Sequence, residues 1–495
     1  MGLEVNKTEF SSQEFERFRA KLFQNLDALK ALLQQPDFGQ GKSTVGAELE
    51  LYIVDLQGRP LLINSQIQKR LGDPQLTLEL NRYNLEYNLT PVAVTGRPFS
   101  QIENEITDVL QRLNQLAEEH DGLVIPIGIL PTLQRSDFGL QAMTDLSRYH
   151  VLTKALAEMR GESFSVKIDG ADPISLRSSD VTLEGANTSM QMHYRVAPDK
   201  FADTYNAIQL ITPIVLAVSG NSPFLLGHRL WHETRIPLFK HSIDGRSHDS
   251  RESHLPARVS YGNGWVRHGA YELFAETVHL YPPILPICKR ESARRQLAKG
   301  EIPALFELIL HQGTVWPWNR PVYDSGDGGH LRIEMRALPA GPSACDMMAN
   351  AAFAIGLAEG FRQQMEQLLP AIPFQAVVYN FYRAAEKGMQ AELMWPKDLR
   401  ENLTRTPAIE IARSLLPVAK QGLESIGIAD AEIRHYLGMI ECRLAKKKTG
   451  ACWQLRQYNR LSRKLVKRRA LRRMLEHYIE NSLQNRPISE WMDIP

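Results

Sequence analysis

The sequence predicts an α+β protein: one large domain built on an antiparallel sheet with flanking helices, followed by a helical tail. Segments with a polarity period of two, typical of strands, lie between segments with apolar residues every three or four positions, typical of helices. The chain has 495 residues, 43% of them hydrophobic, so it can bury a large core. It shows no repeat of fixed period and no long linker, and helical spacing dominates beyond Pro373.

The first predicted element is an amphipathic helix within residues 10–33. Its apolar residues recur at three- and four-residue intervals, at Phe15, Phe18, Leu22, Leu26, Leu29 and Leu33. Because proline is poorly tolerated inside a helix, we expect this helix to end before Pro36. Residues 1–43 are therefore predicted to be an N-terminal helix that precedes the first strand.

The first predicted strand is VGAELELYIVD, residues 45–55. Successive side chains of a strand point to opposite faces, so Glu48, Glu50 and Tyr52 share one face, and the other face is apolar. Two interpretations are open at this point. The acidic face could be the solvated side of an antiparallel sheet, where such alternation is ordinary, or it could line a cation site.

Three further segments repeat this pattern: RYNLEYNLTP (82–91), NTSMQMHYRV (187–196) and GHLRIEMRALP (329–339). Their polar faces carry Asn84, Glu86 and Asn88 in the first, Ser189, Gln191, His193 and Arg195 in the second, and Arg332, Glu334 and Arg336 in the third. A face that is merely solvated would show more Thr, Ser and Lys. The repeated Glu, His, Gln and Arg therefore favour a functional site.

The residue types of these faces suggest phosphoryl chemistry. Carboxylates with one imidazole suit Mg²⁺ or Mn²⁺, and Mg²⁺ often bridges protein carboxylates to nucleotide phosphates. Arg332 and Arg336 would hold phosphate oxygens or neutralise charge during phosphoryl transfer. No P-loop or dinucleotide glycine motif lies between a strand and a helix. The Gly-rich run DSGDGGH, residues 324–330, precedes a strand and is expected to be a hairpin turn or a flap over phosphates.

Helical spacing also appears around residues 100–120, 199–218 and 345–369. The most apolar run, residues 208–218, contains Pro213 and is shorter than the roughly 20 residues that a bilayer span needs. The N-terminus has no apolar signal region. The four cysteines form no C-x-x-C pair: Cys288, Cys345, Cys442 and Cys452. We therefore expect a soluble, cytoplasmic protein.

The formal net charge of +2 argues against a general binder of polyanions, and nucleic acid is not an expected partner. Basic residues gather near the C-terminus, where residues 443–473 include no acidic residue. This stretch is predicted to be a basic helix packed by leucines, with a surface for polyanions as the alternative. The leucines are Leu461, Leu465, Leu471 and Leu475. Residues 441–495 are thus predicted to form a basic helical C-terminal segment.

Ordered segments from about residue 44 to about residue 455 resemble the glutamate–cysteine ligase type 2 family, carboxylate-amine ligases related in fold to glutamine synthetase. GAELELYIVD resembles the family's first G-x-E-x-E strand, LEYNLTP its acidic strand that ends in Thr-Pro, and TSMQMHYRV the strand with its metal-binding histidine. LAVSGNSPFLLGHRLWHETR, TVWPWNRP, RIEMRALPA and YNFYRAAEKGMQAEL follow in the family's order. Each motif alone is weakly specific for the family, but the motifs in this order are strongly specific for it.

The resemblance implies a curved antiparallel sheet of the glutamine synthetase/guanidino kinase type, whose concave face holds two or three divalent ions between ATP and an amino-acid carboxylate. It implies six metal ligands: Glu48, Glu50, Glu79, Glu86, His193 and Glu334. It makes Glu334 and Arg336 catalytic, with Arg336 on the transferred phosphate, and places Gln191 and Arg332 at the nucleotide. Arg235 matches the arginine that holds the substrate carboxylate. Asn221 would belong to a substrate loop or, alternatively, to a plain turn at a helix end.

The predicted function is that of an ATP-dependent carboxylate-amine ligase, with Mg²⁺ or Mn²⁺ as cofactor and residues 44–440 as the catalytic domain. The resemblance makes glutamate and cysteine the leading pair, joined in a γ-glutamyl-type amide through an acyl phosphate. TGACWQ, residues 449–454, resembles a family segment expected to close over the nucleotide. Two alternatives are a non-catalytic nucleotide-binding regulatory protein and a phosphotransferase on the same fold. The expected partners are small molecules, with no membrane, and the prediction allows a homo-oligomer.

Overall fold

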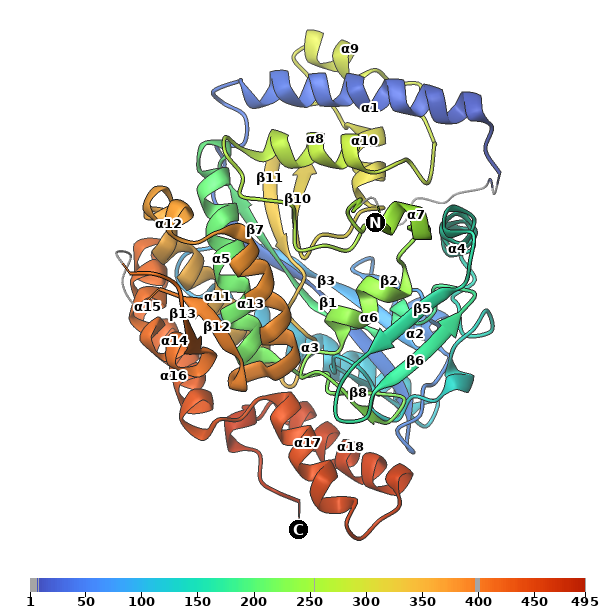
Figure 1. Cartoon of the computed structure of the whole chain (residues 1–495), viewed down its shortest axis with the longest axis vertical. Helices are drawn as coiled ribbons and strands as arrows, with labels where there is room; N and C mark the ends of the chain where they lie inside the picture. Colours follow the sequence, from blue (N-terminus) through green and yellow to red (C-terminus); the bar gives the residue numbers. More distant parts are fainter. Residues whose placement is uncertain (1–6, 8, 253, 397–400, 495) are drawn as a thin grey trace.

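A seven-stranded antiparallel sheet forms the centre of the molecule (Figure 1). The computed structural model describes residues 7, 9–252, 254–396 and 401–494. The strands lie in the order β10-β11-β7-β1-β3-β2, and β4 also pairs with β1. They are β1 (Thr44–Asp55), β2 (Leu76–Leu78), β3 (Asn84–Ala93), β4 (Gly122–Ile125), β7 (Met190–Val196), β10 (Asn319–Asp324) and β11 (His330–Met335). The four strands predicted from polarity are therefore confirmed, as β1, β3, β7 and β11.

Helices surround this sheet, and three small hairpins complete the fold. The helices are α1 (Ser12–Leu33), α2 (Asn64–Leu71), α3 (Pro98–Glu118), α4 (Ser147–Arg160), α5 (Phe201–Ser219), α6 (Arg235–Ser242), α7 (His248–Glu252), α8 (Ala270–Leu280), α9 (Ala293–Ala298), α10 (Phe306–Gln312), α11 (Ala344–Arg362), α12 (Met365–Ala371), α13 (Phe374–Lys387), α14 (Ala408–Ser414), α15 (Leu416–Ser425), α16 (Asp430–Lys446), α17 (Gly450–Leu461) and α18 (Lys467–Leu483). The hairpins pair β5 (Phe164–Ile168) with β6 (Ile174–Ser178), β8 (Phe224–Leu225) with β9 (His228–Arg229), and β12 (Glu392–Trp395) with β13 (Thr404–Pro407).

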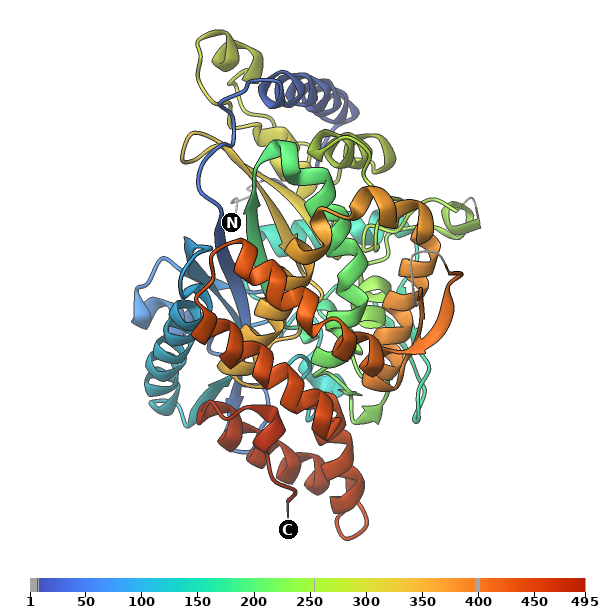
Figure 2. The same ribbon diagram turned by 90° about the vertical axis from the view of Figure 1, so that its left-hand side faces the viewer.

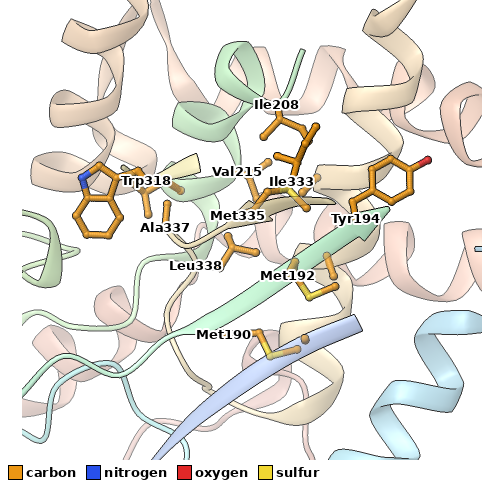
Figure 3. Packing of buried hydrophobic residues seen from close by; sticks show 14 of the residues in the cluster. Met190, Met192, Tyr194, Ile208, Val215, Trp318, Ile333, Met335, Ala337 and Leu338 are labelled. Atoms are coloured by element: carbon orange, nitrogen blue, oxygen red, sulfur yellow. The ribbon is translucent and has the colours of Figure 1, made fainter. Parts of the chain in front are cut away.

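One face of the sheet is apolar and packs into the core. Met190, Met192 and Tyr194 of β7 are almost fully buried, and Figure 3 shows them in one cluster with Ile208 and Val215 of α5. Full burial of one such side chain stabilises the fold by about 1.5–3 kcal/mol. A register slip of one residue would turn the polar side chains of the strand into this core. The apolar face therefore holds the opposite, polar face in one arrangement.

The most apolar helix, α5, belongs to the core. With the preceding turn it spans Pro198–Ser219, 22 residues that are long and apolar enough to cross a bilayer, but 89% of its most apolar stretch is buried inside the protein. It packs against α11 and α13. Figure 2 shows this side of the molecule, with the green α5 and the orange-red helices layered over the strands. Its apolar character is thus that of a core helix.

The helical spacing of residues 345–369 is confirmed, in two consecutive helices. The structure has two helices, α11 and α12, because a turn in which the N–H of Gln364 donates to the carbonyl of Phe361 (2.8 Å) ends α11. Apolar spacing gives no signal of this break, since the buried Phe361 and Met365 keep a helical interval across it.

The basic C-terminal segment forms two helices, α17 and α18, rather than one. Leu461, Leu471 and Leu475 are buried and Leu465 is partly buried, which confirms that leucines pack this segment. Arg468 and Arg469 are exposed. The predicted domain boundary after residue 440 falls inside α16, so the segment does not begin at a break in the chain.

Candidate metal centre

The pairing of three strands brings Glu48, His193 and Glu334 together on the polar face of the sheet. Glu334 of β11 lies opposite His193 of β7, and His193 lies opposite Gly46 of β1, two positions from Glu48 on the same face. One ligand atom from each of the three residues lies within 4.8 Å of the other two. Nε2 of His193 is 3.1 Å from Oε1 of Glu48. The sheet register thus builds a compact ligand cluster from distant parts of the chain.

The chemistry of this cluster fits a divalent cation. Both ring nitrogens of His193 are buried; within the described part of the chain Nδ1 has no hydrogen-bond partner, and Nε2 meets only Oε1 of Glu48, at 3.1 Å and without good hydrogen-bond geometry. Although burial opposes this, the charges of Arg320 and Arg336 hold the pKa of Glu334 well below its usual value, and His193 does the same for Glu48. Both carboxyls are therefore ionised at neutral pH. Two carboxylates beside this imidazole are suitable ligands for Mg²⁺ or Mn²⁺.

A second carboxylate group comprises Glu50, Glu79, Glu86 and Glu184. Glu50 and Glu86 face each other across β1 and β3. Burial raises the pKa of Glu86 to about 8, helped by the charges of Glu48 and Glu50. Burial and the charge of Glu50 raise the pKa of Glu184 to about 8 as well. Burial, with repulsion from Glu86 and Glu50, raises the pKa of Glu79 well above its ordinary value. A cation among these groups would hold them ionised. Among the described residues, only Glu48, His193 and Glu334 form a group of three that brings its ligand atoms within 4.8 Å of one another.

Arg336 and Gln191 connect the ligand cluster of Glu48, His193 and Glu334 with the second carboxylate group. Nη1 of Arg336 donates to Oε1 of Glu334 and to Oε1 of Gln191. Nε2 of Gln191 in turn donates to Oε1 of Glu50 at 2.8 Å, and the N–H of Ser189 donates to Oε2 of Glu50 at 2.6 Å. Although burial opposes it, the charges of Glu334 and Glu50 raise the pKa of Arg336. A permanent positive charge is therefore fixed where the two groups meet.

Arg332 lies on the same face of β11 but outside both carboxylate groups. Its Nη1 is 2.9 Å from Oδ2 of Asp324 and 3.3 Å from Nε2 of His330, and Arg195 of β7 lies opposite it. The run DSGDGGH connects β10 to β11, which confirms the predicted hairpin turn. Arg332 is thus placed toward the hairpin end of the polar face.

Arg235 begins α6 and is buried next to an acidic partner. Its Nε donates to Oε1 of Glu233 at 2.8 Å, and its Nη2 donates to the carbonyl of Ala337 at 2.6 Å. Burial raises the pKa of Glu50, and the charges of Arg336 and Arg235 oppose that rise, so the charge of Arg235 acts on the second carboxylate group. Its role toward a substrate carboxylate stays a prediction.

Asn221 makes packing contacts with the C-terminal helices. Its Nδ2 donates to the carbonyl of Ala340 and to the hydroxyl of Tyr478, both at 2.8 Å, and its Oδ1 accepts from Nε2 of Gln454 at 3.0 Å. A Cβ added to Gly450 would lie 1.9 Å from that Oδ1, so α17 begins in tight contact with Asn221. These contacts favour the helix-end turn over the substrate loop, and they place the segment 449–454 in the packed interior.

Two residues of the site were not found from the sequence, Arg320 and Glu184. Arg320 lies on β10, and its Nη2 is 2.6 Å from Oε2 of Glu334. The next residue, Pro321, argues against a strand at this place, because proline is not tolerated in central strands. The structure accommodates Pro321 because β10 lies at the edge of the sheet. Glu184 lies in a single 3-10 turn, Glu184–Ala186, where no polarity period exists to reveal it. The available signal for Arg320 was that it shares one face of the strand NRPVYD with Asp324, while Pro321 and Tyr323 share the other.

We expect Mg²⁺ to raise the melting temperature of metal-free protein more at about pH 8 than at about pH 5.5. Carboxyls with a raised pKa in the folded state stabilise it at low pH, and this contribution is lost as pH rises toward the pKa of about 8 found for Glu86 and Glu184. A bound cation removes the repulsion that develops there. Differential scanning calorimetry at the two pH values, with and without Mg²⁺, measures the effect.

The variant Glu86→Gln should lose most of this pH-dependent gain, because it removes one of the repelling charges and one ligand. The exposed helix residue Asp108 provides the control, since Asp108→Asn should respond to Mg²⁺ as the unmodified protein does. An equal response at both pH values, or an unchanged response in Glu86→Gln, would count against a cation site in the second carboxylate group.

Residues 44–451 match the model of a protein family described as glutamate-cysteine ligase family 2 (GCS2). Among curated proteins, the chain is similar to one from Frankia alni that is provisionally named glutamate–cysteine ligase 2-1, with 24% identity over 399 residues, which are 78% of this chain and 85% of the relative. A protein of Thermobifida fusca, provisionally named glutamate–cysteine ligase 2, is 23% identical over 409 residues, 80% of this chain and 84% of the relative.

Solved structures with a similar fold include a glutamate–cysteine ligase from Francisella tularensis crystallised with AMP. It has a TM-score of 0.50 and 12% identity, and the alignment covers 90% of this chain and 91% of the other. A bifunctional glutathione synthetase from Pasteurella multocida also has a TM-score of 0.50 and 12% identity, over 93% of this chain and 55% of the other. At this level of identity the likeness is one of fold.

Proposed function

Since the chain belongs to glutamate-cysteine ligase family 2 and is a ligase by that membership, we propose that it joins glutamate to cysteine at the expense of ATP, through an acyl phosphate. The observation that carries the proposal is the cluster of Glu48, His193 and Glu334 with Arg336 bonded to Glu334. It combines candidate cation ligands and a fixed positive charge on one face of the sheet. Phosphoryl transfer from a nucleotide requires both kinds of group.

The side chains of the two carboxylate groups and His193 would hold the Mg²⁺ or Mn²⁺ ions, which when bound offset the negative charge of nucleotide phosphates. Arg336 is held by Glu334 and Gln191 before any substrate arrives. It can therefore stabilise charge on the transferred phosphoryl group without reorganising. Arg332, toward the hairpin, supplies a further positive charge for the nucleotide.

Arg235 supplies a buried positive charge that acts on Glu50, and we assign it to the carboxylate of the amino-acid substrate. Phosphorylation makes a carboxylate a good acyl donor, and an amine that has lost its proton can then displace phosphate to form the amide. The four cysteines are free, which supports the cytoplasmic location that we propose. The domain limits and the homo-oligomer stay predictions.

We expect the purified protein with ATP and Mg²⁺ to release phosphate when glutamate and cysteine are both present. If the γ-carboxylate of glutamate is phosphorylated, oxygen-18 placed in that carboxylate must appear in the released phosphate, because the amine displaces the phosphate with one carboxylate oxygen attached. Mass spectrometry of the phosphate and of the amide product measures the transfer.

Screening other amino-acid pairs under the same conditions tests the choice of substrates. Phosphate without the label, formed together with the amide, would contradict the acyl phosphate. A phosphorylated product that forms without any amide would instead support the phosphotransferase alternative. Turnover with another pair of amino acids, and not with glutamate and cysteine, would support the ligase assignment and contradict the assignment of its substrates.

A further inference from the structure

A groove of about 700 Å³ lies apart from the candidate metal centre, among α4, α6, α7 and the β5–β6 hairpin. Figure 1 shows β5 and α6 on the same side of the molecule, with α4 and α7 above them. The groove receives Lys240 and His241 from the C-terminal end of α6, whereas Arg235, at the other end of this helix, belongs to the site already described. At 1.5 Å per residue, the 8 residues of α6 separate the two ends by about 12 Å.

The side chains that line this groove are strongly basic. Six of its described lining residues are cationic: Arg160, Lys167, Arg177, Lys240, Arg246 and Arg251. Two are carboxylates, and both are already engaged. Asp244 holds Arg246 through two contacts of 2.9 Å, and Glu162 is shared between Arg160 at 3.3 Å and Arg251 at 3.0 Å. The described lining therefore has more positive charge than its own acids can balance.

Part of this positive charge is built into the interior rather than carried by mobile surface side chains. Arg160 has a side chain only 2% exposed, and it is held by the carbonyl of Ser163 at 3.1 Å and that of Asp244 at 2.5 Å. Burial, followed by the charge of Arg251, lowers the pKa of Arg160, and the charges of Asp244 and Glu162 oppose this. The charge of Arg251 repels that of Arg160, and a bound anion would relieve this repulsion.

Two cations on the hairpin are available for a ligand. Lys167 of β5 and Arg177 of β6 lie on one face of the hairpin, because Ser165 pairs with Arg177 and Lys167 lies two residues further along. Within the described ranges, neither side chain makes a hydrogen bond or an ion pair. The described lining also includes no Phe, Tyr or Trp side chain on which a nucleobase could stack.

We propose that this groove is a binding site for a small anion with two or more phosphate groups. Arginine and lysine together recognise phosphate oxygens through directed hydrogen bonds and charge, and the volume exceeds the need of a single phosphate. The proposal does not rest on the ligase assignment. Two sources share this chemistry: the phosphate chain of ATP, bound here away from the metal centre, and a separate phosphorylated ligand.

The test is calorimetric titration of the full chain with inorganic tripolyphosphate in the absence of Mg²⁺, so that the acidic face does not attract the anion. We expect binding, and we expect Lys167→Gln/Arg177→Gln to weaken it at least about tenfold, because two charge-assisted contacts are lost. The matched control is Arg468→Gln/Arg469→Gln, which removes two exposed charges from α18 and should bind as the unmodified protein does. Circular dichroism and melting temperature verify that both variants fold.

Undiminished binding in the Lys167/Arg177 variant would overturn the proposal, as would equal weakening in the control, which would reveal attraction to the overall charge. The source of the phosphate follows from a second titration, with ATP. Weaker ATP binding in the Lys167/Arg177 variant identifies the nucleotide, and unchanged ATP binding with lost tripolyphosphate binding identifies a separate ligand. Neither titration requires turnover, so a failure of the ligase assignment would leave this result intact.

Discussion

Replacing Glu334 by Gln should lower ATP turnover by about 10²–10³-fold while the protein stays folded, and a phosphate-release assay with Mg²⁺ and both amino acids measures this. Glu334 is fully buried, and its two oxygens meet Arg320 and Arg336. Gln has nearly the same shape, but it carries no charge for a cation, and its amide nitrogen faces one of the two arginines as a second donor. The variant should therefore lose stability as well as kcat, so turnover is compared per mole of folded protein.

A matched control separates this effect from a general cost of losing a buried carboxylate. Glu359 of α11 is also buried and bonded to an arginine, with Oε2 at 3.0 Å from Arg362 and Oε1 at 2.9 Å from the hydroxyl of Tyr194, on the apolar side of β7. Glu359→Gln should lose stability and keep the turnover of the folded fraction. Equal losses of turnover in the two variants would refute the assignment of Glu334 to the metal centre.

The strands that carry the site were predictable because alternation in polarity is a local property of sequence. The apolar partners of Gln191 and His193 had to point away from them, and in the structure Met190, Met192 and Tyr194 do so. Register between strands is not local. That Glu334 lies opposite His193 follows from the pairing of β11 with β7, which no alternation in either strand encodes.

The sequence likewise did not predict that the six proposed ligands divide into two groups. It also did not predict which contacts Asn221 makes. The motif around Asn221 allowed a substrate loop or a turn, and the choice depends on Tyr478 and Gln454, which lie far along the chain and use its amide. Glu184 was not predicted as a site residue, because a single acidic residue in a turn belongs to no polarity period. Residues outside regular elements become visible only through the contacts that the fold gives them.

Replacing Arg443 by Met should lower the free energy of unfolding by about 3–5 kcal/mol, seen as a shift in the midpoint of urea unfolding. Arg443 of α16 is buried, with Nη2 at 2.8 Å from Oδ1 of Asp346, and its Nη1 donates to the carbonyl of Val218 at 3.0 Å. Burial raises the pKa of Asp346, and Arg443 opposes that rise. Without Arg443, the carboxyl of Asp346 is left buried without its countercharge.

The same helix offers a control for the burial of this pair. Arg434 of α16 pairs with Asp430 at the surface, and Arg434→Met should cost no more than about 1 kcal/mol. Similar costs for the two variants would contradict the buried pair as a source of stability.

Because Asp346 also accepts from the N–H of Ile488 at 2.8 Å, the pair joins α11 and α16 to the C-terminal end of the chain. Removing the residues beyond 440 should therefore destabilise the whole fold, so loss of activity on truncation would report unfolding rather than the loss of a lid.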